Sequence, residues 1–285
     1  MRVSGFTIIR NGIMYVYPFK EAILSILPLC DEMIINVGKS KDGTLEAVKS
    51  IAETINDKKI KIFESEWDDK LKDGLVLSEE TNKALKKCSG DWCFYIQSDE
   101  VLHEKYYPVV RNAMEKYLNE EKVEGLRFRY KHFYGSYDYY QDNYRKWYPK
   151  ESRVIRRRDD IVSWGDAMDF RHKDGSKLFV KDINAEIYHY GWVRPPEKLI
   201  KKRIDFELLY NDSEKIQEKI SKLQNYDEIG NLKKFNEPHP EVMKERIAES
   251  RWNFDAQLDK QKPDWIRKIL IFFHPVTKRL KKIFN

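Results

Sequence analysis

Cysteine is scarce in this sequence, which has three (Cys30, Cys88 and Cys93) and no Cys-x-x-Cys pair. An odd number without that spacing argues against a disulfide framework and against a zinc site, and it fits a reducing compartment. Long hydrophobic runs are also missing. Because no stretch of about 18 apolar residues occurs, we expect no transmembrane helix. The N-terminal segment lacks the apolar region of a signal peptide, so we expect a cytoplasmic protein.

Acidic residues are absent from the last segment of the chain, where the excess positive charge collects. The net charge is +6, and the segment 265–285 contains basic residues but no acid. Since the rest of the chain is roughly neutral, we do not expect a nucleic-acid-binding surface spread over the fold. Apolar residues such as Trp265, Ile269 and Phe272 alternate with the basic ones. This combination is typical of a helix lying on an anionic membrane surface, and a helix packed on the domain is the alternative.

The first half of the chain alternates strand-like apolar runs with amphipathic segments. Strands are expected at 3–10, 31–38, 59–67 and 91–97. Helices are expected at 17–29, 42–55, 77–88 and 104–120. Such alternation predicts βαβ units, and therefore a parallel sheet with right-handed crossovers. A hydrophobic content of 41% is sufficient for a large core.

The pattern changes after about residue 123. Strands at 124–140, 152–158 and 183–192 follow one another without long helices, which predicts a mixed or antiparallel extension of the sheet. Beyond Pro195 and Pro196 the strand signals stop. Charged helices are expected at 197–210, 213–226 and 239–258. We therefore predict one domain at 1–195 and a helical extension at 196–285 that ends in the basic tail.

The strand expected at 91–97 ends abruptly in Ser98, Asp99 and Glu100. In open parallel sheets, ligands bind beyond the carboxyl ends of the strands. Two adjacent carboxylates at such a place have two uses, which the residues alone leave open. They are oxygen ligands for a hard divalent cation, or they cap the start of the next helix.

The longer stretch 80–100 resembles the signature of family 2 glycosyltransferases, which have the GT-A fold. Asn82, Gly90, Asp91 and Asp99 match that signature in register. The segment 7–12 resembles the first nucleotide-binding strand of the family. A Ser-x-Asp-Gly-Thr turn of the family is matched by Ser40, Asp42, Gly43 and Thr44. The resemblance covers about residues 3–195. It implies an α/β fold with a GT-A-type, Rossmann-like mixed sheet flanked by helices.

The resemblance also implies which residues bind the donor, a sugar linked to a nucleotide diphosphate. The residues expected to bind the nucleotide sugar are Arg10, Asn11, Asn36, Asp42, Asn82, Gln97 and Ser98. A divalent cation, Mn²⁺ or Mg²⁺, is expected at Asp99 with Glu100 and His189, where it would neutralise the leaving diphosphate. The chain departs from the family at Gln97, which stands where the first Asp of the motif is usual. The cation is therefore expected to be weakly held.

The acceptor side is implied less directly. An inverting transferase needs a general base, and we expect Asp166, or else Asp169, in that role. Both can instead be ordinary loop acids, and His189 can instead belong to an aromatic cluster. Tyrosines and tryptophans are dense over 130–149, where they can line an acceptor groove or fill a half-buried strand.

The function implied by the resemblance is a hexosyltransferase-like, inverting glycosyltransferase of cell-surface polysaccharide or lipopolysaccharide synthesis. Its acceptor is then a glycan or a lipid-linked glycan, reached from the inner face of the membrane through the basic tail. One alternative is a degenerate member that binds sugar nucleotides without turnover. A second is a sugar-phosphate nucleotidyltransferase, although the Gly-rich basic loop of such enzymes is missing after the first strand.

Overall fold

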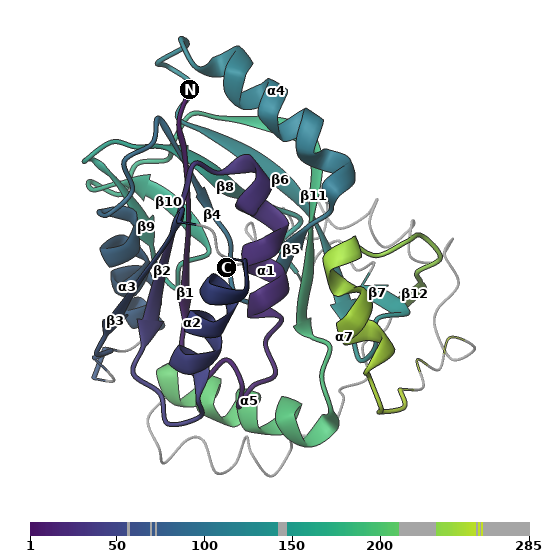
Figure 1. Cartoon of the computed structure of the whole chain (residues 1–285). Coiled ribbons are helices and arrows are strands. Elements are labelled where there is room, and N and C mark those ends of the chain that lie inside the picture. The colour runs from purple at the N-terminus through teal and green to yellow at the C-terminus, as the bar shows by residue number, and fades with distance from the viewer. Residues whose placement is uncertain are drawn as a thin grey trace, which may run out of the picture.

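The computed structural model describes residues 1–55, 58–68, 70–71, 73–141, 147–210, 232–254, 256 and 258. In the helix α5 (Pro196–Tyr210), side chains are described as far as residue 205. One large sheet runs through the molecule, and helices cover both of its faces (Figure 1). The α/β class expected from the sequence, a mixed sheet flanked by helices, is therefore confirmed.

The first half of the chain forms the parallel part of the sheet. Its strands are β1 (Val3–Ile9), β2 (Glu32–Gly38), β3 (Ile60–Ser65) and β4 (Trp92–Tyr95). β1 pairs in parallel with both β4 and β2, and β3 extends the sheet beyond β2. Every residue of β1 and β2 is buried, as expected for strands that are covered on both faces. The βαβ alternation predicted this half correctly.

Helices pack on the two faces with different partners. The helical segments before α5 are α1 (Phe19–Ile26), η1 (Leu27–Leu29), α2 (Thr44–Ile55), α3 (Leu75–Leu85), η2 (Glu104–Tyr106) and α4 (Tyr107–Tyr117). Apolar residues of α1, α2 and α4 share one core with the sheet, including Ile23, Val48 and Met114. On the other face, Ala84 and Leu85 of α3 pack with Phe6 of β1.

The second half adds strands of both directions, as expected. They are β5 (Glu100–Leu102), β6 (Gly125–Tyr134), β7 (Tyr139–Gln141), β8 (Lys150–Arg156) and β11 (Val180–Trp192). β8 is antiparallel to β4 and β6, whereas β11 is parallel to β6 and antiparallel to β5. A separate hairpin, β9 (Ile161–Trp164) with β10 (Asp169–His172), packs beside α3. This hairpin brings its turn to the end of the sheet where β4 ends.

Residues after 196 return to the sheet. A short strand, β12 (Leu232–Lys234), pairs with β7, and η3 (Glu241–Met243) and α7 (Lys244–Ala248) follow it. Phe235 and Met243 pack against Phe133 and Tyr190 in a third, aromatic core. The division at 195/196 and the helical character of the whole extension stay predictions. Within the described ranges, no helix is long and apolar enough to cross a membrane.

Two expectations from the sequence differ from the structure, and a third concerns residues outside the described ranges. The helix-cap interpretation of Glu100 is wrong, because residues 100–102 form β5 and α4 begins only at Tyr107. The helix expected at 239–258 is not continuous, because η3 and α7 end at Ala248 and residues 250–254 are not helical. The helix expected at 213–226 and the basic tail 265–285 lie outside the described residues.

Gly90, two residues before β4, lies where the backbone of β1 leaves no room for a side chain. Its amide donates to Ser4 Oγ at 2.8 Å, and a Cβ at this position would lie 2.7 Å from the backbone nitrogen of Ser4 and 2.8 Å from the carbonyl oxygen of Arg2. We expect Gly90→Ala to lower the free energy of unfolding by about 1–3 kcal/mol, because backbone atoms must shift to admit the methyl group. Urea unfolding followed by tryptophan fluorescence measures this loss. Lys86→Ala, at an exposed position nearby, is the control; equal midpoints for both variants would contradict the steric argument.

Candidate functional site

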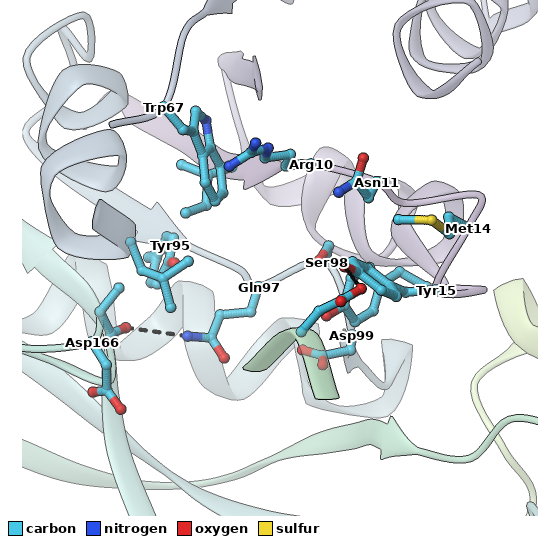
Figure 2. Close-up of a pocket in the computed structure, with 15 residues that line it drawn as sticks. Arg10, Asn11, Met14, Tyr15, Trp67, Tyr95, Gln97, Ser98, Asp99 and Asp166 are labelled. Carbon is cyan, nitrogen blue, oxygen red and sulfur yellow. Dashed lines mark hydrogen bonds between the residues drawn. The ribbon is translucent and has the colours of Figure 1, made fainter. Parts of the chain in front are cut away.

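A cavity of about 490 Å³ opens where β1 and β4 end (Figure 2). Its walls come from the loop after β1, the segment after β4, the β9–β10 turn and α5. The lining residues are Ile8, Arg10, Asn11, Met14, Tyr15, Tyr17, Trp67, Leu77, Tyr95, Gln97, Ser98, Asp99, Asp166, Ala167 and Asp205. Arg10, Asn11, Gln97, Ser98, Asp99 and Asp166, all expected from the sequence, therefore share one cavity.

The loop after β1 is held by the Ser-x-Asp-Gly-Thr turn. Asp42 Oδ2 accepts from the amide of Met14 at 2.8 Å, and Thr44 Oγ1 accepts from the amide of Gly12 at 2.9 Å. Burial alone would raise the pKa of Asp42, but hydrogen bonds from Thr44 and Met14 outweigh it and lower that pKa. Asp42 thus shapes the cavity wall from behind instead of lining it.

Two residues of this loop have left-handed backbone. Asn11 has φ 54° and Val16 has φ 56°, an unfavourable conformation for a β-branched side chain. Val16 separates Tyr15 from Tyr17, and both tyrosines line the cavity. The hydroxyl of Tyr15 also donates to Asp205 of α5 at 2.6 Å. The turn around residue 42 and α5 together hold this strained loop in place.

Arg10 and Trp67 form one end of the cavity. The guanidinium carbon of Arg10 lies 5.4 Å from the centre of the Trp67 ring, and Figure 2 shows the two side chains against each other. The indole packs against Gly38, where any Cβ would overlap it. Among the described residues, the buried Nε1 of Trp67 has no hydrogen-bond partner. A flat ring and a positive charge therefore lie at this end of the cavity, while the indole N–H is buried against Gly38.

Asp99 lies at the other end, surrounded by positive charge. Its Oδ2 accepts from Lys202 Nζ at 3.2 Å and lies 3.8 Å from His189 Nε2. Burial alone would raise the pKa of Asp99, but the charges of Lys202, of His189 when it is protonated at low pH, and of Arg194 hold that pKa at about 2. Asp99 is therefore a carboxylate at neutral pH.

His189 is buried beside Asp99 and is neutral. Burial lowers the pKa of His189 to about 4, although the charge of Asp99 opposes the shift. Its Nδ1 lies 3.0 Å from Nδ1 of His132, whose Nε2 faces the carbonyl oxygen of Tyr148 at 2.8 Å. His189 also contacts Trp147 and Tyr148. The aromatic surroundings of His189 thus come from His132 and the segment 147–148, and its role at a metal stays a prediction.

A divalent cation fits this corner poorly. Asp99 Oδ2 and His189 Nε2 face each other, but the ammonium of Lys202 already binds that carboxylate oxygen. Within the described ranges, no three His, Cys, Asp or Glu side chains gather closely enough to hold a metal ion. Gln97, which replaces the usual first Asp, donates its amide to the carbonyl oxygen of Ala167 at 3.2 Å. The donor set is therefore one carboxylate, already paired, and one imidazole.

Glu100 points away from the cavity into a buried ion pair. Its two oxygens accept from Arg153 Nε at 2.9 Å and Nη2 at 2.8 Å, and both side chains are 0% exposed. The hydroxyl of Tyr130 and the backbone N–H of Gln97 also donate to this carboxylate. A metal role for Glu100 stays a prediction that this arrangement does not favour. The pair fixes the bend that presents Ser98 and Asp99.

The β9–β10 turn supplies the carboxylate opposite Asp99. Gly165 and Ala167, on either side of Asp166, have φ 59° and φ 62°, so the turn is sharp. Asp166 lines the cavity, whereas Asp169 is the first residue of β10, pairs with Trp164 and is not among the lining residues. The structure thus places Asp166, and not Asp169, where a base could meet a ligand.

Asn36 and Asn82, expected to bind nucleotide, serve buried networks behind the cavity. Asn36 donates to Glu80 Oε2 at 2.9 Å and accepts from Ser65 at 2.7 Å. Asn82 exchanges two hydrogen bonds with the backbone of Ser163 and so ties α3 to the β9–β10 hairpin. Neither is among the lining residues. Their nucleotide-binding roles stay predictions.

Several residues of the site were not expected from the sequence. Tyr15 and Tyr17 lie four and six residues after Asn11, and two tyrosines so close to the first strand were the available signal. Trp67 ends the strand expected at 59–67. Asp205 and Lys202 lie in a segment that looked like an ordinary charged helix, so no local signal singled them out. α5 crosses the end of the sheet where β1 ends, and it brings Asp205 into the cavity lining and Lys202 against Asp99 (Figure 1).

Most of the chain matches the sequence model of one protein family. The sequence model described as "Glycosyl transferase family 2" matches residues 15–218. No curated protein matches the chain.

The chain is also similar to solved structures, at low identity. S. aureus TarS is 16% identical with a TM-score of 0.40, over 78% of this chain and 42% of TarS, so the chain spans less than half of that protein. A mannosyltransferase from Pyrobaculum calidifontis, solved with GDP-Man and Mn²⁺, is 23% identical over 44% of this chain and 34% of its own, with a TM-score of 0.34. Glucosyl-3-phosphoglycerate synthase from Mycobacterium tuberculosis, solved with Mn²⁺, UDP and phosphoglyceric acid, is 20% identical over 47% of this chain and 43% of its own, with a TM-score of 0.32.

Proposed function

The chain belongs to glycosyl transferase family 2, and from this premise we propose that it transfers a sugar from a nucleotide-diphosphate donor to an acceptor hydroxyl. The observation that supports the proposal most is the cavity at the ends of β1 and β4. It has Arg10 and Trp67 at one end, Asp99 at the other, and Asp166 on the β9–β10 turn. Ligands of open α/β sheets bind at such strand ends.

The donor would lie along the β1 side of this cavity. The Trp67 ring can stack on the base, and Arg10 can pair with a phosphate oxygen in a charge-assisted hydrogen bond. Tyr15, Tyr17 and Ser98 offer hydroxyl groups to ribose or sugar. Asp99 faces the same space, where its charge is compensated by Lys202.

Asp166 would act on the acceptor. Transfer forms a bond between the acceptor oxygen and the sugar carbon as the bond to the diphosphate breaks, and the acceptor proton needs a base. A carboxylate on a sharp turn at the cavity wall is suited to take that proton. With the base and the leaving group on opposite sides, the expected stereochemical outcome is inversion.

The finer assignments follow the family resemblance. We propose a hexose donor and a glycan or lipid-linked acceptor of cell-surface polysaccharide or lipopolysaccharide synthesis. A peripheral position at the inner face of the membrane would depend on the tail 265–285, which lies outside the described residues. The aromatic segment 130–149 gives little support to an acceptor groove, because its residues Phe133, Tyr134 and Tyr137 are buried in the core.

Arg10 provides the test of donor binding. We expect Arg10→Ala to weaken binding of UDP, GDP or dTDP, whichever binds the unchanged protein, by about tenfold to a hundredfold, the usual range for a hydrogen bond to a charged group. Titration calorimetry measures the dissociation constants. Arg111→Ala, an exposed arginine of α4, is the matched control and should bind like the unchanged protein. Equal affinities of all three proteins would contradict the placement of the donor.

A degenerate binder without turnover is the second candidate, favoured by Gln97 where an acid is usual. Release of nucleoside diphosphate from UDP-glucose, GDP-mannose and dTDP-sugars separates the two. Tight nucleotide binding without release, with or without acceptor glycans, would favour the binder. The sugar-phosphate nucleotidyltransferase has less support, because the loop after β1 contains Asn11 and Gly12 but no Gly-rich basic segment.

A further inference from the structure

Lys202 is a buried lysine that reaches the cavity wall from outside the predicted catalytic domain. It lies on α5, and its Nζ donates to Asp99 Oδ2 at 3.2 Å and to the carbonyl oxygen of Gly191 at 3.0 Å. The ammonium also lies 4.9 Å from the centre of the Tyr17 ring, and Tyr17 and Asp99 both line the cavity. Lys202 is 8% exposed; burial and the charge of Arg194 lower its pKa to about 7, although the ion pair with Asp99 opposes that shift.

The ammonium occupies the corner between the two expected metal ligands. A Cβ built at Gly191 would lie 2.5 Å from His189 Nε2 and 2.8 Å from Asp99 Oδ2, which shows how closely these groups converge around Gly191. Lys202 binds the carbonyl of this same residue. A divalent cation that bound both Asp99 Oδ2 and His189 Nε2 would therefore lie against a positive charge, and the repulsion would be strong because the site is buried.

Arg194 adds a second fixed positive charge. It is 0% exposed, donates to the carbonyl oxygens of Tyr15 and Gly191 at 2.7 Å each, and lies 5.0 Å from the centre of the Tyr17 ring. When Lys202 is protonated, its charge and that of Arg194 together exceed the single charge of Asp99. This corner is thus electropositive through protein side chains, without any ion.

We propose that Lys202 takes the place of the divalent cation: it holds Asp99 in an ion pair, excludes the metal from the Asp99–His189 corner and provides the positive charge that faces the donor diphosphate. This inference rests on the proposed function, since it concerns how the donor is bound. It makes Lys202 a charge-compensating residue of the donor site. The anionic diphosphate in turn favours the charged form of the ammonium.

The test measures nucleotide binding and metal binding separately. UDP, GDP and dTDP are titrated into the full chain by calorimetry, once in EDTA and once in Mn²⁺. Bound Mn²⁺ is counted by electron paramagnetic resonance with and without the nucleotide. The variants are Lys202→Met, which keeps the length but removes the charge, Lys202→Arg, which keeps the charge, and Lys201→Met, an exposed neighbour on the same helix, as the control.

For the unchanged protein and Lys201→Met, we expect nucleotide affinities in EDTA and in Mn²⁺ that agree within about twofold, and no bound Mn²⁺ beyond that held by free nucleotide. Lys202→Met should lose about tenfold or more in EDTA. With the carboxylate of Asp99 released, it should also bind Mn²⁺ and recover affinity when Mn²⁺ is added. Lys202→Arg should stay independent of Mn²⁺.

Two results would overturn the proposal in different ways. If the unchanged protein binds nucleotide only with Mn²⁺ and shows a bound ion, the substitution of metal by Lys202 is wrong, while the donor site stands. If none of the three nucleotides binds in either buffer, the proposed function itself is wrong and this inference falls with it. Because the unchanged protein alone decides both results, poor folding of a variant does not prevent the test.

Discussion

Replacement of Asp166 by Asn is expected to lower kcat of sugar transfer by about 10²–10⁴-fold, the usual contribution of a general base. The amide has nearly the same shape as the carboxylate but cannot accept the acceptor's proton. Because Asp166 lies on the β9–β10 turn, across the cavity from the Arg10–Trp67 end, nucleotide affinity should change little. Release of nucleoside diphosphate under saturating donor measures kcat, and calorimetry measures binding.

Asp169→Asn is the matched control. The structure places Asp169 in the β10 ladder opposite Trp164, outside the lining of the cavity, so its loss should change kcat by less than about threefold. A loss of activity in Asp169→Asn with normal turnover in Asp166→Asn would reverse the assignment of the base. Equal small effects in both would mean that neither carboxylate takes the proton.

Replacement of Arg153 by Met is expected to destabilise the fold by about 3–5 kcal/mol, because it leaves the carboxylate of Glu100 buried without its partner. Both side chains of the pair are 0% exposed, and Arg153 lies over the rings of Tyr95 and Tyr130. Tyr95 lines the cavity, so the loss should also loosen the wall behind the donor. The free energy of unfolding in urea, followed by tryptophan fluorescence, measures the effect.

The double variant Glu100→Gln/Arg153→Met removes both charges and should lose less stability than Arg153→Met alone, since no isolated charge stays buried. Lys150→Met is the control for an exposed ion pair. Its partner is Asp182, the two side chains are 39% and 43% exposed, and the cost should stay below about 1 kcal/mol. If Arg153→Met unfolds no more easily than Lys150→Met, the buried pair does not stabilise the fold as described.

The Glu100–Arg153 ion pair also shows what the sequence motif could not predict. Asp99 and Glu100 are adjacent, and from the sequence both were expected at the metal. Ser98 and Asp99 form a turn, whereas Glu100 begins β5, so the two carboxylates leave the backbone in different directions. Asp99 lies in the cavity wall, and Glu100, the first residue of β5, turns inward to Arg153. Which of the two faces the ligand depends on where β5 pairs with β11.

The sequence by itself determined the α/β order, the parallel half of the sheet and the group of Arg10, Asn11, Gln97, Ser98, Asp99 and Asp166 that meets in one cavity. It could do so because periodicity and turn motifs act over short distances along the chain, and parallel strands bring their ends together. Only the tertiary structure decided that Asn36 and Asn82 serve buried networks and that Lys202 meets Asp99. Lys202 and Asp99 are 103 positions apart in the sequence. Their ion pair therefore depends on where α5 lies against the sheet, which no local pattern encodes.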